Sequence, residues 1–304
     1  MNLTAEIFQD ADKAREHLEA NRWPDGAVCP HCGSVGEATK LQGRAARPGV
    51  WQCNACREQF SVTVGTVFEK SKVPLNKWLL ATYLMNSSKK GISAHQIGRT
   101  LGVTYKTAWF MCHRIREAMK RNPMAALMAG TIVADETFIG GKFKNRHAKN
   151  RRYADGNDKT AVLALVNKET GEVRSRVVAN VTGSTLRSVF NEHVDVKGST
   201  LHTDEFQSYK LIGKKFQDHQ AVNHKEGEYV RDGASTNVAE SYFAQLKRSI
   251  DGTHHNVSIA HLPRYLNEYD FRFSTRKLTD ANRMNAIVDG MGGRRISYEP
   301  LRRY

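Results

Sequence analysis

Two pairs of cysteines constrain the N-terminal part of this chain more than any other feature. Cys29 and Cys32 form one C-x-x-C pair, Cys53 and Cys56 form a second, and twenty residues separate the pairs. Four thiolates held by two such knuckles can occupy the corners of a tetrahedron around one Zn²⁺ ion. The pattern predicts a small metal-held module with about one structural zinc per chain. Trp51 and Phe60 flank the second knuckle, which suits a short β-hairpin with each knuckle as a turn.

Other uses of these cysteines fit the sequence less well. A redox pair needs a thioredoxin-like βαβ unit, which the surrounding pattern does not show, and disulfides need a secreted protein. The first residues, Met1 to Gln9, include Glu6 and lack the apolar core of a signal peptide. The fifth cysteine, Cys112, lies in an apolar helical pattern and is predicted to be a small buried side chain.

The charge of the chain indicates the class of partner. Its 304 residues carry a formal net charge of +15 with a pI near 9.7, a balance that favours polyanions such as nucleic acid. The alternative is a basic surface that is simply solvated. The sequence contains no apolar run of transmembrane length, so we expect a soluble, cytoplasmic protein with no membrane partner.

A helical region follows the cysteine module. Residues 1–24 show an amphipathic pattern, and residues 75–85, 94–101 and 105–119 form three further helical patterns. Ser93 and Thr104 are suitable N-caps, and Gly102 is a suitable helix stop. Two helices joined by a short glycine-bearing turn predict a helix-turn-helix, with an ordinary three-helix spacer as the alternative. The third helix would present to DNA Tyr105, Lys106, His113, Arg114 and Arg116.

The pattern changes to strands from Gly130 onward. Residues 131–135 form an apolar run that ends in Asp135, residues 160–166 and 172–178 form a hairpin, and residues 199–204 form a run that ends in Asp204. Helices are predicted over 185–193 and over 236–250, the latter capped by Ser235 or Thr236. This order predicts an α/β domain with a mixed sheet.

Carboxylates mark a candidate catalytic site in this domain. Asp135 and Asp204 each end an apolar strand, and Glu240 lies on the last predicted helix, with Asn237 one turn before it and Lys247 seven residues after it. Converging carboxylates bind hard divalent cations, and a two-metal site can catalyse phosphoryl transfer. The alternative for each residue taken singly is a solvated surface charge.

These residues resemble the acidic triad of DDE transposases. Thirty-five residues lie between Asp204 and Glu240, and a basic residue follows the glutamate by seven. The stretches Ala134-Asp-Glu-Thr-Phe-Ile-Gly-Gly, His202-Thr-Asp-Glu and Thr236-Asn-Val-Ala-Glu-Ser are similar to ISXO-type bacterial insertion-sequence transposases, which also carry a zinc ribbon. Some members of that family have Asn as the third ligand, so Asn237 is an alternative to Glu240, which we favour for its charge and spacing.

The resemblance implies an RNase H-like fold and a mechanism. Asp135, Asp204 and Glu240 would hold Mg²⁺ or Mn²⁺, expected as two ions, for hydrolysis at the ends of the element and joining of the freed 3′-hydroxyl to target DNA. Lys247 would hold a phosphate near the cut. The implied partner is double-stranded DNA, both the terminal repeats and the target, and the joining of two ends implies a homodimer or higher oligomer. The implied location is the nucleoid of a bacterial cytoplasm.

The predicted organisation has four parts: residues 1–68 (helix and zinc ribbon), 69–127 (helix-turn-helix), 128–280 (catalytic domain) and 281–304 (basic tail). Further DNA contacts are expected from Lys247 and Arg248 and from a basic stretch that could instead be a solvated insertion. That stretch contains Lys142, Lys144, Arg146, Lys149, Arg151 and Arg152. Two other functions stay open, a catalytically inert DNA-binding regulator and an RNase H-like nuclease without strand transfer.

Overall fold

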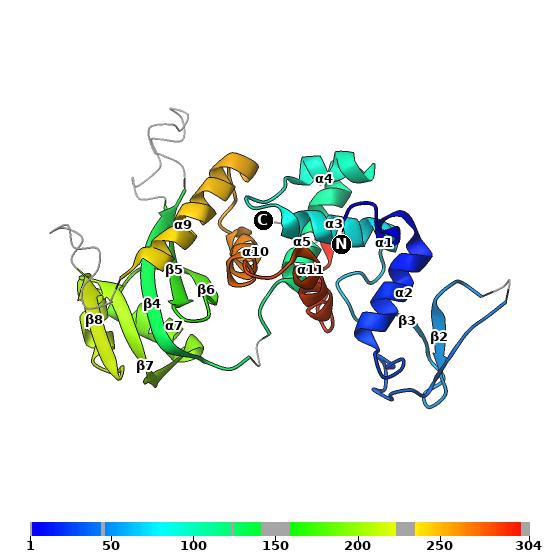
Figure 1. Ribbon diagram of the computed structural model, residues 1–304, viewed down its shortest axis with the longest axis horizontal. Coiled ribbons are helices and arrows are strands. Elements are labelled where there is room, and N and C mark those ends of the chain that lie inside the picture. Colours follow the sequence, from blue (N-terminus) through cyan, green and yellow to red (C-terminus); the bar gives the residue numbers. More distant parts are fainter. Residues whose placement is uncertain (1, 44–45, 123–124, 141–158, 223–234, 299–304) are drawn as a thin grey trace. The chain divides into compact units, whose positions relative to one another are not determined.

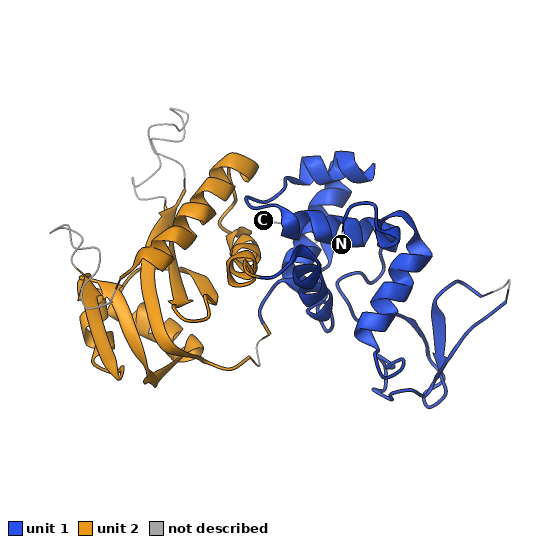
Figure 2. Ribbon diagram, viewed as in Figure 1, with its two compact units in different colours: residues 1–121, 278–304 blue, residues 122–277 orange. Residues whose placement is uncertain are grey.

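The computed structural model describes residues 2–43, 46–122, 125–140, 159–222 and 235–298 (Figure 1). The chain forms two compact units, one of residues 1–121 with 278–304 and one of residues 122–277 (Figure 2). The expected ribbon, helical segment and C-terminal tail thus belong to one unit. In the described part of the chain, no helix is both long and apolar enough to cross a bilayer.

The cysteine module is a three-stranded antiparallel sheet in the order β1-β2-β3. Its strands are β1 Ala38–Lys40, β2 Val50–Cys53 and β3 Gln59–Ser61. Trp51 of β2 is paired with Phe60 of β3. The Trp23 ring packs edge-on against both, at centroid distances of 6.0 and 5.6 Å. This aromatic group gives the small module an apolar core in addition to its cysteines.

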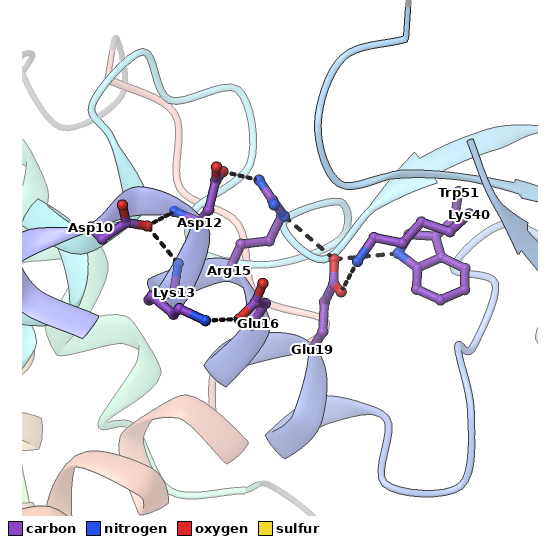
Figure 3. Close-up of polar contacts among 8 residues, drawn as sticks. All are labelled: Asp10, Asp12, Lys13, Arg15, Glu16, Glu19, Lys40 and Trp51. Carbon is purple, nitrogen blue, oxygen red and sulfur yellow. Dashed lines mark hydrogen bonds and ion pairs between the residues drawn. The ribbon is translucent and has the colours of Figure 1, made fainter. Parts of the chain in front are cut away.

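The N-terminal amphipathic pattern forms two helices rather than the single helix expected over residues 1–24. They are α1 Glu6–Gln9 and α2 Ala11–Arg22. Asp10 separates them in an extended conformation, and its carboxylate accepts hydrogen bonds from the amides of Asp12 and Lys13 (Figure 3). An aspartate that satisfies the first amides of a helix starts a new helix at that point.

A carboxylate of α2 joins this helix to the ribbon. Glu19 accepts hydrogen bonds from Lys40 Nζ at 2.8 Å and from Trp51 Nε1 at 3.3 Å (Figure 3). The Glu19 side chain is largely buried, so the ion pair with Lys40 is less screened by solvent than a surface pair. The ribbon and α2 therefore form one structural element.

Three helices follow, close to the predicted bounds: α3 Leu75–Ser87, α4 Ala94–Leu101 and α5 Tyr105–Ala118. Ser93 Oγ accepts from the amide of Gln96, and Thr104 Oγ1 accepts from the amide of Thr107. Gly102 ends α4 with a left-handed φ of 63°. Helix α4 therefore meets α5 through a three-residue turn, as a helix-turn-helix requires.

Part of the segment predicted as a basic tail, residues 281–304, forms a helix. Helix α11 Asp280–Asp289 buries Met284, Ile287 and Val288 and packs against α2 and α3. Beyond it, Val67 donates its amide to Met291 O, and the Arg294 guanidinium donates to the carbonyls at the end of α5. The apolar residues of α11 supply part of the core of the N-terminal unit. This burial explains why the segment forms an ordered helix. Arg302 and Arg303 lie outside the described residues.

The second unit is built on a mixed five-stranded sheet in the order β6-β5-β4-β7-β8. The central strand β4 is antiparallel to β5 and parallel to β7, while β5 and β6 are antiparallel and β7 and β8 are parallel. The strands are β4 Met128–Ile139, β5 Thr160–Asn167, β6 Val173–Val178, β7 Val194–Asp204 and β8 Asp218–Val222. This is the mixed sheet and α/β fold class that the sequence predicts.

Helices cover both faces of this sheet (Figure 1). Helices α9 Asn237–Ser249 and α10 Leu262–Ser274 share an apolar core with one face, which includes Val133 of β4. A π-helical turn, η3 Ile250–His254, follows α9. Helices α7 Gly183–His193 and α8 Gln207–Gly213 cover the opposite face, which includes Ile132.

The sequence pattern placed the end of one strand incorrectly. Asp135 was expected to end its strand, but β4 continues to Ile139 and remains paired with β5 as far as the pair Ile139 and Thr160. The added residues Thr137, Phe138 and Ile139 are all good strand formers. Asp135 therefore lies within the sheet, whereas Asp204 is the last residue of β7, as predicted.

Candidate metal and catalytic sites

The four cysteines converge on one point. Their sulfur atoms all lie within 4.8 Å of one another, with Cys29 to Cys56 and Cys32 to Cys53 each at 3.6 Å. A tetrahedral zinc site with Zn–S bonds of about 2.3 Å would separate its sulfurs by about 3.8 Å. The geometry therefore fits one zinc ion bound by four thiolates.

Hydrogen bonds lower the pKa of Cys53 and Cys32 and favour their thiolate forms, whereas burial and the neighbouring sulfurs raise the pKa of Cys56. The amide of Cys56 and the hydroxyl of Ser34 lower the pKa of Cys53 to about 6, the amide making the larger contribution. Ser34 Oγ lies 3.2 Å from the Cys53 sulfur and 3.3 Å from that of Cys32. The C-x-x-C pattern does not include Ser34, although its position two residues after Cys32 is a signal that it contacts the site.

The two knuckles contain backbone turns of the same type. The amide of Gly33 donates to Cys29 O at 2.9 Å, and the amide of Arg57 donates to Cys53 O at 3.0 Å. Each donor directly follows the second cysteine of its pair and has a left-handed φ, 80° for Gly33 and 65° for Arg57. The repeated turn directs both pairs of sulfurs toward the same point.

The first two candidate acids lie level with each other on adjacent strands. Val133 of β4 is paired with His202 of the parallel strand β7, and two residues further along each strand this offset brings Asp135 beside Asp204. Side chains alternate between the faces of a sheet, so Asp135 shares the face of Val133, which packs against α9. Both aspartates therefore lie on the α9 side of the sheet.

Helix α9 brings the third acid to this face. Ala239, Tyr242, Phe243 and Leu246 form its buried stripe, as the 3.6-residue period predicts. Asn237, Glu240 and Lys247 are exposed on the remaining surface of the helix. Thr236, expected as the cap of this helix, instead donates its hydroxyl to Glu240 Oε1 at 2.9 Å. This contact holds the glutamate over the first turn of α9.

The charges of Asp204 and Glu240 act on Asp135. The pKa of Asp135 is raised to about 7, first by burial and then by the charge of Glu136. A hydrogen bond from the Glu136 amide opposes this shift. The charges of Asp204 and Glu240 make smaller contributions that raise the pKa further. Repulsion between these charges means that a bound cation would favour the ionised form of Asp135. Three carboxylates of this kind form a donor set suited to Mg²⁺ or Mn²⁺.

The acids are less closely grouped than the cysteines. Among the residues that the structure describes, the cysteines form the only group of three or more His, Cys, Asp or Glu side chains with ligand atoms all within 4.8 Å of one another. A pair of cations about 4 Å apart needs a wider arrangement of ligands than a single ion does. Asp135, Asp204 and Glu240 do not form a group as compact as the cysteines.

Glutamates directly follow both aspartates in the chain. Glu136 points to the opposite face of the sheet, where its carboxylate accepts a 2.6 Å hydrogen bond from Tyr209 of α8. Burial raises the pKa of Glu136. Glu205 follows the last residue of β7 and is exposed.

The expected DNA-contacting residues fall into three groups. Lys106, Lys247 and Arg248 are exposed, as is Tyr105, whose ring stacks on His95 of α4. By contrast, Arg114 and Arg116 are 4% and 2% exposed, so the prediction that α5 presents them to DNA is wrong. The basic stretch, with Lys142, Lys144, Arg146, Lys149, Arg151 and Arg152, lies outside the described residues.

The surroundings of Arg114 explain its burial. Its guanidinium donates to Glu69 O at 2.6 Å and lies over the rings of Trp78 and Phe110. His113 is also fully buried. Helix α3 and the loop before it, which contains Glu69, cover this side of α5. The helical period of α5 alone does not reveal that this side is covered.

Comparison with known proteins matches two domain models. Residues 9–59 match a transposase zinc-ribbon domain model, and residues 127–274 match the ISXO2-like transposase domain model. The second unit is an ISXO2-like transposase domain. The two matches span about two thirds of the chain and contain the cysteines, Asp135, Asp204 and Glu240. These domains indicate an insertion-sequence transposase.

A relative supports the same assignment along most of the chain. An uncharacterized protein in the transposable element ISH50 of Halobacterium salinarum is 27% identical over 281 residues, which cover 89% of this chain and 93% of the relative. The zinc-ribbon match begins at residue 9 and so includes α2, in agreement with the contacts of Glu19. Helices α3, α4 and α5 lie between the two matched domains.

Proposed function

We propose that this transposase cuts DNA at the ends of an insertion sequence by metal-dependent hydrolysis and joins the freed 3′-hydroxyl ends to target DNA. The observation that carries the proposal is the β4–β7 register, which brings Asp135 level with Asp204 on the face where α9 presents Glu240. Phosphoryl transfer needs little covalent chemistry from a protein, so positioned charge is sufficient for catalysis.

The acids have the role of metal ligands in this proposal. Asp135, Asp204 and Glu240 would hold two Mg²⁺ or Mn²⁺ ions, with Asn237 as a supporting oxygen ligand. Divalent ions at such a site would polarise the scissile phosphate and neutralise charge on the attacking and leaving oxygens. Asp135 is paired with Ala164 of β5, so the strand that carries it is supported by a neighbour on that side.

Basic residues beside the acids would bind the DNA backbone. Lys247 is exposed two turns after Glu240 on the same helix, and Arg248 is exposed next to it. Lys247 is suited to hold a phosphate close to the cut, because seven residues bring the helix back to nearly the same face. The net charge of +15 supports a general attraction to DNA that weakens with salt.

Recognition of the terminal repeats is assigned to the ribbon and to α4 and α5. The N-terminal end of the second helix of a helix-turn-helix commonly reads base edges in the major groove. At that end of α5, Tyr105 and Lys106 are exposed. We therefore place the sequence-reading surface at the start of α5. Its C-terminal half is excluded, because Arg114 and Arg116 are buried there.

The decisive experiment is a cleavage and joining assay with the DNA that flanks the gene. Wild-type protein with Mn²⁺ or Mg²⁺ should nick a duplex that carries the terminal repeat and join its 3′ end to a second duplex. Asp204→Asn should abolish both steps, whereas Glu205→Gln, at the exposed neighbouring position, should retain them. Binding without cleavage by wild type would favour a regulator, and cleavage without joined products would favour a nuclease.

A further inference from the structure

Helix α10 closes the edge of the catalytic sheet. Strand β6 is an edge strand, and two of its outward amides are bound by α10: Val173 donates to Ser274 Oγ at 2.9 Å, and Ser175 donates to Asp270 Oδ2 at 2.8 Å. Four residues of helix rise about 6 Å and two residues of strand about 6.8 Å, so the two spacings match. Edge amides bound in this way cannot pair with another chain.

Asp270 makes a second set of contacts that Ser274 does not share in the described structure. Its Oδ1 accepts from Ser175 Oγ at 2.7 Å and lies 2.6 Å from the hydroxyl of Tyr242, which is also 2.9 Å from Ser175 Oγ. The carboxylate is the stronger acceptor and therefore takes the single Tyr242 proton. Tyr242 belongs to α9 and is 1% exposed. Asp270 thus joins α10, β6 and α9 at one point.

This point of contact is close to the candidate catalytic glutamate. Tyr242 lies two residues after Glu240, which is about 3 Å along the helix axis and about 200° around it. Apolar contacts of Ala239, Phe243 and Leu246 hold α9 on the sheet but are not directional. A hydrogen bond to a fixed carboxylate restricts both rotation and sliding of the helix. The position of Glu240 relative to the sheet then depends on Tyr242.

We propose that Asp270 is a positioning residue, which holds Tyr242 and thereby fixes the register of α9 that places Glu240 beside Asp135 and Asp204. The predicted effect on cleavage rests on the proposed function. The contact between Asp270 and Tyr242, and its effect on α9, do not depend on that function. It assigns to α10 a task beyond covering the sheet edge. Asp270 itself contacts neither substrate nor metal in this scheme.

Two variants separate positioning from edge closure. Tyr242→Phe removes the hydroxyl that joins α9 to Asp270 and keeps the bond from Ser175 to Asp270. Ser274→Ala is the matched control, because it removes an edge bond on the same helix without touching α9. Asp270→Asn replaces one of the two acceptor oxygens with an amide donor, so it cannot keep both the edge bond and the Tyr242 bond. Amide hydrogen exchange on the full-length chain should show α9 opening roughly tenfold or more faster in Tyr242→Phe and Asp270→Asn, but unchanged in Ser274→Ala.

The catalytic consequence has a separate readout. At saturating Mn²⁺, Tyr242→Phe should cut terminal-repeat DNA roughly tenfold more slowly than wild type, and Ser274→Ala should cut at the wild-type rate. Thermal melts should show that the two variants lose similar stability, which excludes a general loss of fold as the cause. If Asp270→Asn does not fold, Tyr242→Phe carries the test alone.

The outcomes distinguish failure of this inference from failure of the proposed function. If wild type does not cut DNA, hydrogen exchange alone decides the inference. Equal protection of α9 in Tyr242→Phe and Ser274→Ala would overturn it. Faster opening of α9 with an unchanged cleavage rate would support the contact but overturn its link to Glu240.

Discussion

Gly33 and Arg57 occupy equivalent positions in the two zinc knuckles and share a left-handed backbone, with φ values of 80° and 65°. Each donates its amide to the first cysteine of its pair. Glycine adopts this conformation at little cost, whereas a residue with a β-carbon loses about 1 kcal/mol or more there. One knuckle therefore carries a backbone strain that the other avoids.

Exchanging these residue types should shift stability in opposite directions. Arg57→Gly should stabilise the N-terminal unit, and Gly33→Ala should destabilise it, each by about 1 kcal/mol. A β-carbon at Gly33 would meet no atom within 4 Å, so its cost comes from the backbone alone. Thermal melts of the zinc-loaded chain measure both changes, and a destabilising Arg57→Gly would disprove the explanation.

Metal analysis should find about one zinc per chain. Cys29→Ser should lose this zinc and loosen the ribbon, because three thiolates and a hydroxyl bind zinc less tightly than four thiolates. Cys112→Ala is the control, since this buried cysteine of α5 lies outside the cluster and its variant should retain the metal. A wild-type protein purified without zinc would contradict the assignment of the ribbon.

The third metal ligand can be identified by comparing two exposed residues on α9. Glu240→Gln should lower the cleavage rate on the order of 10²-fold, because it removes a negative charge from the site. Asn237→Ala should lower it on the order of tenfold, as expected for a supporting neutral ligand. Both rates are measured at saturating Mn²⁺. A larger loss for Asn237→Ala would transfer the main role to the asparagine.

Lys106 and Arg114 should respond differently to truncation, although both were expected to contact DNA. Lys106→Ala should reduce the salt dependence of duplex binding by about one charge and leave the melting temperature unchanged. Arg114→Ala should lower stability by about 2 kcal/mol, because it removes a buried hydrogen bond and ring contacts. Binding isotherms at several salt concentrations, with thermal melts, separate the two effects.

Stability of the catalytic unit should fall as the pH rises from about 4 to about 6. Burial raises the pKa of Asp270 from 3.8 to about 6, despite hydrogen bonds from Tyr242 and Ser175 that lower it. The folded state therefore holds this proton more tightly than the unfolded state, and its contribution to stability is lost as the pH passes the folded pKa. Asp270→Asn should reduce this slope in urea titrations at a series of pH values.

Local signals in the sequence predicted much of the fold. Ser93, Gly102 and Thr104 fixed the bounds of α4 and α5 because caps act within one turn. The buried residues Ala239, Tyr242, Phe243 and Leu246 of α9 follow the 3.6-residue helical period. Asp204 was correctly placed at a strand end because the polar turn after it interrupts an apolar run.

Features that depend on distant contacts were not predicted. The extension of β4 past Asp135 is stabilised by pairing with β5, and the burial of Arg114 depends on Glu69 and Trp78. Asp270 carried no local signal, because its partners Ser175 and Tyr242 lie 95 and 28 residues away. The level positions of Asp135 and Asp204 likewise require the strand register, which a sequence pattern does not give.

The return of α11 to the N-terminal unit has a consequence for how the chain matures. The catalytic unit is in effect an insertion between two parts of one folded body, since residues 122–277 separate α5 from α11. During synthesis, the ribbon and its helices must wait for about 160 further residues before their core is complete. A copy truncated after residue 277 would therefore lack part of the core of the N-terminal unit, even though Asp135, Asp204 and Glu240 are intact.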